Sequence, residues 1–289
     1  MIAAKKTFGL IVPTLNPGPG WNSWLAGLRK QAVQPQFVLV VDSSSDPGQI
    51  TIPEQCGFEL ISIPRQAFNH GATRQYAFES IPAPADILVY MTQDAVLTDE
   101  MGLAHLLSAF ENPAIAAAYG RQLPCSTADA FAAHARLFNY GPESHTKCLN
   151  DRRRMGIKTC FLSNSFAAYR CSDLKAVGGF PVTDFGEDML VAARLLLNQR
   201  SLAYVAEACV EHSHDYSIIE EFSRYQTIGR FHARNRWLLQ NFGAPTDEGL
   251  RFIRSEFHYL LQSRPHLAPL SGIRTLAKYI GYRLGRLAD

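Results

Sequence analysis

The chain lacks several of the sequence patterns that would assign a function directly. Its six cysteines are scattered, with no Cys-x-x-Cys pair, which favours reduced thiols over a zinc site or a disulfide framework. The formal net charge is only +2, without the basic stripe typical of nucleic-acid binding. The apolar run Phe8–Val12 stops at Pro13, too early for a secretory signal, and no run is long enough to span a bilayer. These absences favour a cytoplasmic protein with no nucleic-acid partner.

The turn that follows this first apolar run also lacks two phosphate-binding signatures. The stretch Pro13–Gly20 contains no Gly-x-Gly-x-x-Gly, which a dinucleotide-dependent oxidoreductase needs at this place. It also contains no Lys or Arg, and a sugar nucleotidyltransferase would be expected to carry one in a glycine-rich loop here. The turn therefore weighs against both classes.

What the sequence does contain is an alternation of strand and helix patterns. Near-continuous apolar runs such as Phe37–Asp42 are typical of strands buried on both faces of a parallel sheet. Strands separated by helices indicate βαβ units, so we expect an α/β fold with a mostly parallel central sheet flanked by helices. The expected strands are 8–12, 37–42, 58–63, 87–94, 115–119, 163–169 and 203–207, and the expected helices among them are 21–31, 72–79, 100–110 and 189–197.

The last part of the chain has a helical pattern over 218–242, 246–261 and 272–287. We therefore expect an α/β domain over 1–217 and a helical C-terminal extension over 218–289 that packs on it. The final helix carries cations and apolar residues at helical spacing. That pattern suits three arrangements: contact with an anionic membrane surface, packing on the domain, or a homodimer contact.

Two aspartates, Asp42 and Asp94, lie where apolar strands run out into polar turns. In open α/β sheets, ligands bind outside the carboxyl ends of the strands. Asp42 suits a ligand rich in N–H and O–H groups, because an ionised carboxylate only accepts hydrogen bonds. Asp94 suits Mg²⁺ or Mn²⁺ on a diphosphate. The alternatives are a turn former at Asp42 and a helix N-cap at Asp94.

Arg74 lies near the start of the helix expected over 72–79. A cation there is unfavourable on its own, because the helix dipole is positive at that end. An anionic partner such as a diphosphate would resolve the conflict. The alternative is a solvated side chain.

Glu187 and Asp188 follow Gly186 and precede an apolar helix. Two acids at a helix N-terminus are favoured by the dipole, so helix capping is one interpretation. The other is catalysis, in which one carboxylate takes the proton of an acceptor hydroxyl that attacks an anomeric carbon.

His212 and His214 lie at the end of an expected strand. Residues two apart on a strand face the same side, so both imidazoles are expected to point together. The pair would complete a metal shell with Asp94 or contact a diphosphate.

Taken in order, these residues resemble the family 2 glycosyltransferases of the GT-A fold, and most closely the bacterial rhamnosyltransferases of polysaccharide and O-antigen assembly. The resemblance covers most of the chain. The segments that carry it are Pro13–Asn16, the Asp42 turn, Phe68–Arg74, Thr92–Ala95, Gly178–Pro181 with Phe185–Asp188, His212–His214, and Arg224-Tyr225 with Gly229.

The resemblance implies a role for each of these positions. It implies catalysis by Asp188 as base, with Glu187 beside it, and a divalent metal, Mg²⁺ or Mn²⁺, at Asp94, His212 and His214. Family members often have two acids where this chain has the single Asp94 between Gln93 and Ala95. The implied nucleotide-sugar contacts are Pro13, Thr14, Asn16, Asp42, Ser44, Arg74, Gln93 and Asp94.

The function implied by the resemblance is inverting glycosyl transfer in bacterial surface polysaccharide synthesis. The donor would be dTDP-L-rhamnose, and the acceptor a hydroxyl of a saccharide or of a polyprenyl-diphosphate-linked saccharide. Such a protein would work in the cytoplasm or at the inner face of the cell membrane. The competing hypotheses are a sugar nucleotidyltransferase and a non-catalytic nucleotide-sugar-binding protein.

Overall fold

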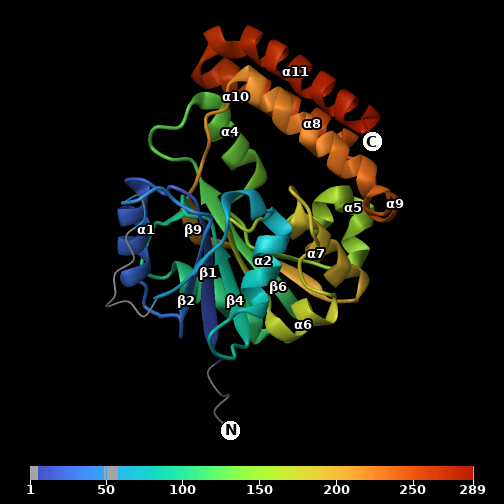
Figure 1. Cartoon of the computed structure of the whole chain (residues 1–289). Coiled ribbons are helices and arrows are strands. Elements are labelled where there is room, and N and C mark those ends of the chain that lie inside the picture. Colours follow the sequence, from blue (N-terminus) through green and yellow to red (C-terminus); the bar gives the residue numbers. More distant parts are fainter. Residues whose placement is uncertain (1–5, 49, 51–57, 289) are drawn as a thin grey trace. The chain divides into compact units, whose positions relative to one another are not determined.

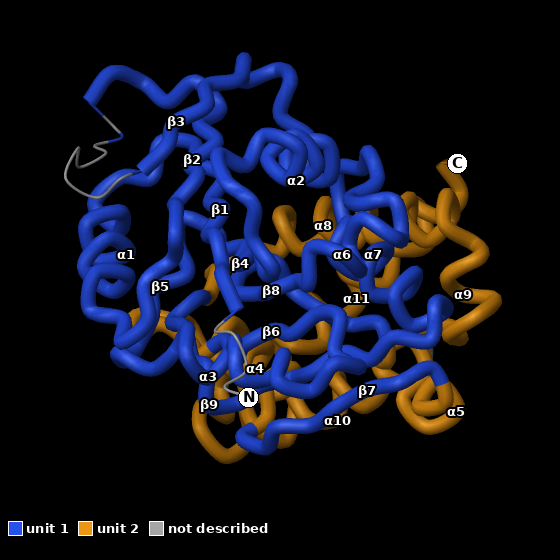
Figure 2. Tube along the Cα trace, turned by 90° about the horizontal axis from the view of Figure 1, so that it is seen from below, with its two compact units in different colours: residues 1–122, 142–149, 160–212 blue, residues 123–141, 150–159, 213–289 orange. Residues whose placement is uncertain are grey.

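The computed structural model describes residues 6–48, 50 and 58–288, which form two compact units (Figure 2). The first unit comprises the chain up to Gln122 together with Pro142–Leu149 and Cys160–His212. The second comprises Leu123–Gly141, Asn150–Thr159 and the chain from Ser213 onward. The sequence partition at 217/218 came from the helical pattern of the C-terminal part alone, so it did not separate the two earlier stretches.

The first unit is built on one mixed sheet. Its strand order is β3-β2-β1-β4-β8-β6-β9-β5, and β7 pairs with β9 at the side. The strands are β1 (Phe8–Thr14), β2 (Val38–Asp42), β3 (Phe58–Ser62), β4 (Ile87–Met91), β5 (Val96–Leu97), β6 (Ile115–Leu123), β7 (His145–Lys147), β8 (Phe166–Arg170) and β9 (Ser201–Glu211).

The α/β class is confirmed, but parallel pairing covers only part of the sheet. Strands β3, β2, β1 and β4 are parallel neighbours. Strand β8 is antiparallel to β4 and β6, and β9 is antiparallel to β5 and β7. An apolar run buried on both faces gives the same pattern in either direction, so the sequence did not show that the later strands reverse.

Helices cover both faces of this sheet. Figure 2 shows α1 (Gly20–Arg29) and α3 (Gly102–Ser108) on one side of the row of strands, and α2 (His70–Glu79), α6 (Cys171–Ala176) and α7 (Glu187–Leu197) on the other. Trp21 and Trp24 of α1 stack at 4.7 Å and lie in the apolar core with Phe110. On the opposite face, Tyr90 of β4 packs edge-on against Tyr169 and Phe180.

The expected strands and helices are present with small shifts at their ends. The first strand runs through Pro13, which pairs with Val41 in register, and ends at Thr14. The helical expectation missed α4 (Ala130–Asn139), which begins with an N-cap at Asp129. No disulfide joins the described cysteines, Cys125, Cys148, Cys160, Cys171 and Cys209, and Cys56 lies outside the described residues.

The second unit is helical (Figure 1). None of the helices in the described part of the chain has the length and apolar character that crossing a membrane would take. The helices of this unit are α4, α5 (Arg152–Met155), α8 (Ile218–Arg234), α9 (Arg236–Phe242), α10 (Thr246–Ser263) and α11 (Ala268–Leu287).

Helices α8 and α11 pack with their backbones in close approach. A Cβ added to Gly285 would lie 2.0 Å from the backbone oxygen of Gln226, and one added to Gly281 would lie 2.4 Å from that of Phe222. Only glycine fits at such a distance. The two glycines therefore fix which face of α11 meets α8.

Buried ion pairs fix the same face. Arg274 of α11 contacts Glu221 of α8 at 2.9 Å, and Lys278 contacts Glu221 at 3.1 Å. Lys278 also lies 3.6 Å from Glu256 of α10, whose other oxygen accepts a hydrogen bond from Ser271. Breaking a buried pair leaves a buried charge uncompensated, so these contacts favour one register of the three helices.

The close approach of α8 and α11 predicts opposite effects for two similar substitutions. We expect Gly285→Ala to lower the free energy of unfolding by about 1–3 kcal/mol, because the methyl group forces the helices apart. Gly272→Ala lies on the same helix with open space around it and should raise stability by up to about 1 kcal/mol. Urea unfolding measures both. Equal changes in the free energy of unfolding for the two variants would contradict the close approach of α8 and α11 at Gly285.

Candidate active site

The ends of the first two strands meet at one edge of the sheet. Thr14 and Asp42 are partners in register, and the Thr14 hydroxyl donates to the Asp42 carboxylate at 2.9 Å. Asp42 also accepts hydrogen bonds from the backbone and hydroxyl of Ser45 at 2.8 and 2.5 Å. A carboxylate has about four acceptor positions, so Asp42 keeps capacity for one further donor beyond these three.

The loops around these strand ends are tied to one another by side-chain amides. The Gln93 amide accepts from the backbone N–H of Leu15 at 2.7 Å and donates to its carbonyl at 2.9 Å. The Asn16 backbone N–H donates to Ser45, and its side chain exchanges two hydrogen bonds with Asp46. Pro13, Thr14, Asn16, Asp42 and Gln93 thus come together as the sequence predicted.

Two residues of these loops have a left-handed backbone. Asn16 has φ 44° and Ser44 has φ 59°. Ser44 donates its hydroxyl to the Ile63 carbonyl, so it anchors the loop to the end of β3. A non-glycine residue at positive φ is uncommon and often marks a functional loop.

Asp94, His212 and His214 form a cluster with metal-binding geometry. Each offers one ligand atom, and these atoms lie within 4.8 Å of one another. Asp94 and His214 are exposed, whereas His212 is buried. The structure thus brings the two histidines together with Asp94, and two of the three residues are exposed.

A neighbouring amide sets the orientation of the His212 ring. The Oε1 atom of Gln122 lies 2.9 Å from Nδ1 of His212, and this oxygen only accepts, so Nδ1 carries the proton. The Nε2 atom of the ring then faces Asp94 at 3.4 Å. Carboxylate and imidazole are both suitable ligands for Mn²⁺ or Mg²⁺.

Glu187 is engaged in a buried ion pair. It contacts the Arg74 guanidinium at 3.1 Å, and both side chains are at least nine-tenths buried. Burial alone would raise the pKa of Glu187, but the Arg74 charge and a hydrogen bond from Asn164 hold that pKa below its usual range. Glu187 therefore stays ionised, and its ion pair with Arg74 makes it a poor proton acceptor.

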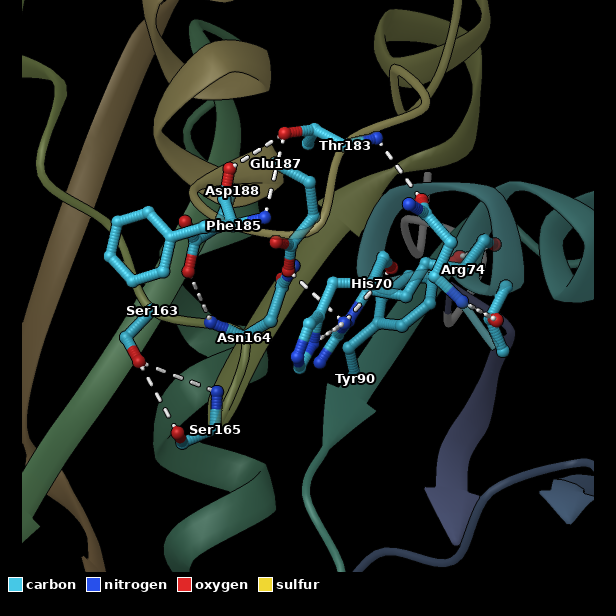
Figure 3. A network of polar contacts seen from close by, with 12 residues as sticks. His70, Arg74, Tyr90, Ser163, Asn164, Ser165, Thr183, Phe185, Glu187 and Asp188 are labelled. Atoms are coloured by element: carbon cyan, nitrogen blue, oxygen red, sulfur yellow. Dashed lines mark hydrogen bonds and ion pairs between the residues drawn. The ribbon is translucent and has the colours of Figure 1, made fainter. Parts of the chain in front are cut away.

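Asn164 connects the two acids (Figure 3). Its side-chain amide donates to Glu187 at 3.0 Å, and its backbone N–H donates to Asp188 at 3.2 Å. Its side-chain oxygen accepts from the Tyr169 hydroxyl at 2.6 Å. Burial and the neighbouring carboxylates raise the pKa of Tyr169 well above its usual value, so this hydroxyl remains a donor.

Asp188 has different properties from its neighbour. Its side chain is partly exposed, and it accepts only backbone N–H groups, from Asn164 and from Met189 at 2.7 Å. Desolvation and the adjacent Glu187 charge raise the pKa of Asp188 to about 7. Two neighbouring carboxylates with pKa values pushed apart indicate two separate roles, and a base is most effective with a pKa near the working pH.

The segment Phe68–Arg74 contacts the chain in front of the two acids. Asn69 caps α2, accepts from the Thr183 backbone at 3.0 Å, and donates to Asp184 at 2.6 Å. A Cβ on Gly71 would overlap the Pro181 carbonyl oxygen. The anionic partner expected for Arg74 is thus Glu187 of the chain itself, where the sequence suggested a diphosphate.

The residues Ser163–Ser165 join these groups at one place. The backbone carbonyl of Ser165 accepts from Thr92 at the start of the Asp94 turn, at 3.3 Å. The Ser163 hydroxyl accepts from Gln122, which orients His212. Because Asn164 between them binds Asp188, these three consecutive residues connect the Asp188 carboxyl with the surroundings of Asp94 and His212.

Sequence reasoning missed Gln122, Asn164 and Tyr169. Gln122 lies near the end of β6, and Asn164 lies just before β8, within a Ser-Asn-Ser stretch that resembles any polar turn. The one available signal was a polar residue beside an apolar strand that is buried on both faces. That signal is weak without knowledge of which strands are neighbours.

Comparison with curated proteins gives relatives over nearly the whole chain, while no protein-family model matches. The O-antigen chain rhamnosyltransferase WbaN of Salmonella anatum is 44% identical over 97% of this chain and 89% of its own length. The O-antigen chain rhamnosyltransferase RfbN of Salmonella typhimurium is 41% identical over 96% of this chain and 88% of its own length.

Solved structures share the fold at low identity. The mannosyltransferase PcManGT from Pyrobaculum calidifontis, in complex with GDP-Man and Mn²⁺, has a TM-score of 0.58 at 16% identity and covers 99% of this chain and 74% of its own. TarS 1–349 of S. aureus with UDP-GlcNAc has a TM-score of 0.58 at 15% identity, over 98% and 91%. Both neighbours have the GT-A fold. With this fold and with relatives above 40% identity, the chain belongs to the family of the O-antigen chain rhamnosyltransferases and is a glycosyltransferase.

Proposed function

We propose that this glycosyltransferase moves L-rhamnose from dTDP-L-rhamnose to a hydroxyl of a saccharide or lipid-linked saccharide, with inversion at the anomeric carbon. The rhamnosyl specificity follows the names of the two Salmonella relatives. The observation that carries the chemical part of the proposal is Asp188, a half-buried residue whose carboxyl pKa is raised to about 7, and which is hydrogen-bonded to the Ser163–Ser165 segment beside the Asp94 turn.

The base in this proposal is Asp188. Inversion by single displacement requires a carboxylate that removes the acceptor proton as the hydroxyl attacks. Asp188 is ionised in about half of the molecules at a pH equal to its pKa, and both of its hydrogen bonds come from fixed backbone groups. These two hydrogen bonds leave acceptor positions on the carboxylate, to which an acceptor hydroxyl would donate.

Glu187 and Arg74 act as positioning residues in this proposal. Glu187 fixes the first turn of α7 by its contacts with Arg74 and Asn164, and its charge helps to raise the pKa of Asp188. Neither side chain is exposed to a ligand. The sequence hypothesis of a catalytic Glu187 is therefore replaced by an electrostatic and structural role.

The nucleotide would lie on the loops after β1 and β2. The remaining acceptor capacity of Asp42 suits an N–H of thymine or a ribose hydroxyl, and the Pro13–Asn16 loop offers backbone groups beside it. Ser44 holds this loop in place through Ile63. Gln93 then connects the nucleotide loop to Asp94, where the diphosphate would begin.

A divalent cation, Mg²⁺ or Mn²⁺, fits the cluster of Asp94, His212 and His214. A bound cation would supply positive charge to the departing diphosphate. The short distance between Asp94 and His212, and the hydrogen bond that orients the His212 ring, support this assignment. PcManGT, which shares the fold, was solved with Mn²⁺.

The first prediction from this proposed function concerns Asp188. We expect Asp188→Asn to lower turnover by about 10²–10⁴-fold, the usual effect of losing a general base, while dTDP affinity stays within about twofold. For the wild type, kcat/KM should rise with pH through about 7, because only the ionised carboxylate accepts the proton. Discontinuous product assays measure turnover and kcat/KM, and titration calorimetry measures dTDP affinity. Turnover close to wild type in the variant would exclude Asp188 as the base.

The second prediction concerns the cation. With dTDP present, Asp94→Asn and His212→Ala should each weaken Mn²⁺ binding by at least about tenfold, and Gln122→Leu by about tenfold through loss of the ring orientation. His105→Ala, a histidine on α3 outside the cluster, serves as the matched control and should leave binding unchanged. Mn²⁺ titration followed by electron paramagnetic resonance gives the affinities. Equal affinity in all four variants would refute the site.

The third prediction separates the ion pair from a diphosphate contact. Arg74→Met and Glu187→Gln should each cost about 3–5 kcal/mol of stability, because each leaves a buried group without its partner. The double variant should cost less than the sum. Arg29→Met, on the exposed surface of α1, is the control.

Urea unfolding and dTDP calorimetry together decide between the two roles of Arg74. A small stability loss in Arg74→Met with a large loss of dTDP affinity would assign Arg74 to the diphosphate. The reverse result supports the ion pair.

A further inference from the structure

Helix α11 has an inverted distribution of side chains. Its buried positions are small or charged, and they recur at helical spacing along one face: Ala268, Ser271, Arg274, Lys278, Gly281 and Gly285. Five of its large aliphatic residues are exposed and form a stripe along the helix: Ile273, Leu276, Ile280, Leu284 and Leu287, with Tyr279 beside them. A surface helix of a globular protein normally has the opposite arrangement.

This arrangement cannot be relieved by rotation of the helix within its unit. The close backbone approaches at Gly281 and Gly285 admit no other residue. Arg274 and Lys278 are held by Glu221 in buried ion pairs. The exposed apolar stripe, in which Leu276 is 57% and Leu287 77% accessible, is therefore a fixed surface of the second unit.

Helix α10 repeats the pattern. It buries Glu256 at 1% exposure, and it exposes Leu250, Ile253, Phe257 and Leu261 at intervals of three and four residues. These four lie on one face of an α-helix. The two consecutive helices of this unit thus both expose apolar stripes, which in soluble monomers usually mark a surface that meets a partner or a membrane.

From the end of α10 through α11, the charged residues have one sign. Between Phe257 and Ala288 the chain contains no Asp or Glu, whereas it contains five Arg or Lys residues. Two of these, Arg274 and Lys278, are neutralised inside the unit by Glu221. The other three, Arg264, Arg283 and Arg286, are exposed.

We propose that the apolar stripes of α10 and α11, with these three arginines, form a docking surface for an anionic lipid bilayer. The helices would lie in the plane of the membrane with their apolar residues in the acyl boundary and the arginines at the phosphates. This proposal concerns where the enzyme binds, and it does not depend on which sugar or acceptor the enzyme uses.

Charge favours a lipid surface over a second copy of the chain. A symmetric dimer through α11 would bring Arg283 and Arg286 of both copies to one interface, and α11 offers no acid to pair with them. Glu248 at the start of α10 is already engaged by Lys158 and Arg251. Lipid phosphates supply the missing negative charge.

Vesicle co-sedimentation of the full chain tests the proposal. With vesicles of phosphatidylglycerol and phosphatidylcholine, the wild type should bind, and it should bind far less to phosphatidylcholine alone. Ile273→Glu/Ile280→Glu should reduce partitioning at least about tenfold, because two charges enter the apolar stripe. Arg283→Gln/Arg286→Gln should reduce it about 25-fold at low salt, since each cation contributes about fivefold.

A control variant adds the same charge elsewhere. Leu60→Glu/Met101→Glu replaces two exposed apolar residues of the first unit and should sediment as the wild type does. Circular dichroism checks that each variant is folded. If the glutamate pair unfolds, the arginine pair, which leaves the apolar stripe intact, decides the result.

Three outcomes would overturn the proposal. One is a wild type that stays in the supernatant with anionic vesicles, and another is equal sedimentation of all variants. The third is a dimer by light scattering that Ile273→Glu/Ile280→Glu converts to a monomer, without vesicle binding by either form. That last result would assign the surface to a second copy. Because no donor or acceptor is present, none of these results depends on the transferase activity.

Discussion

The arrangement of this site depends on three consecutive residues, Ser163–Ser165, just before β8. Strand β8 lies between β4 and β6 in the sheet and is antiparallel to both. The residues just before β8 therefore lie beside the residues that follow β4 and those at the end of β6. Ser163 binds Gln122, Asn164 binds the two acids of α7, and Ser165 binds Thr92. This short segment therefore contacts the chain beside Asp94, the residue that orients His212, and both acids of α7.

The two adjacent acids differ because only one has a cationic partner. Arg74 forms an ion pair with Glu187 inside the protein, so Glu187 stays ionised. The pKa of Asp188 is raised instead, because a second buried negative charge beside Glu187 is unfavourable. The segment Phe68–Arg74 therefore acts on the chemistry indirectly, by holding the loop that carries both acids and by setting their charges. A diphosphate is not needed to explain a cation near the N-terminal end of α2.

The fold class and the strand ends were accessible from the sequence because they depend on local patterns. Apolar runs located the strands, and their polar ends located Asp42 and Asp94. The pairing of Arg74 with Glu187 joins residues 113 positions apart, and the roles of Gln122 and Asn164 depend on which strands are neighbours. The antiparallel direction of β8 likewise leaves no mark in its own residues. Local patterns thus predicted which groups could carry chemistry, while the contacts that position those groups required the structure.

Anomalous diffraction from crystals grown with Mn²⁺ and dTDP would show whether the cation and the base lie at one edge of the sheet. We expect a single strong manganese peak bound by Asp94 and His212 Nε2, with the dTDP diphosphate on the same side of the sheet as the Asp188 carboxyl. A manganese peak on other ligands, or a diphosphate separated from Asp188 by the sheet, would contradict this expectation.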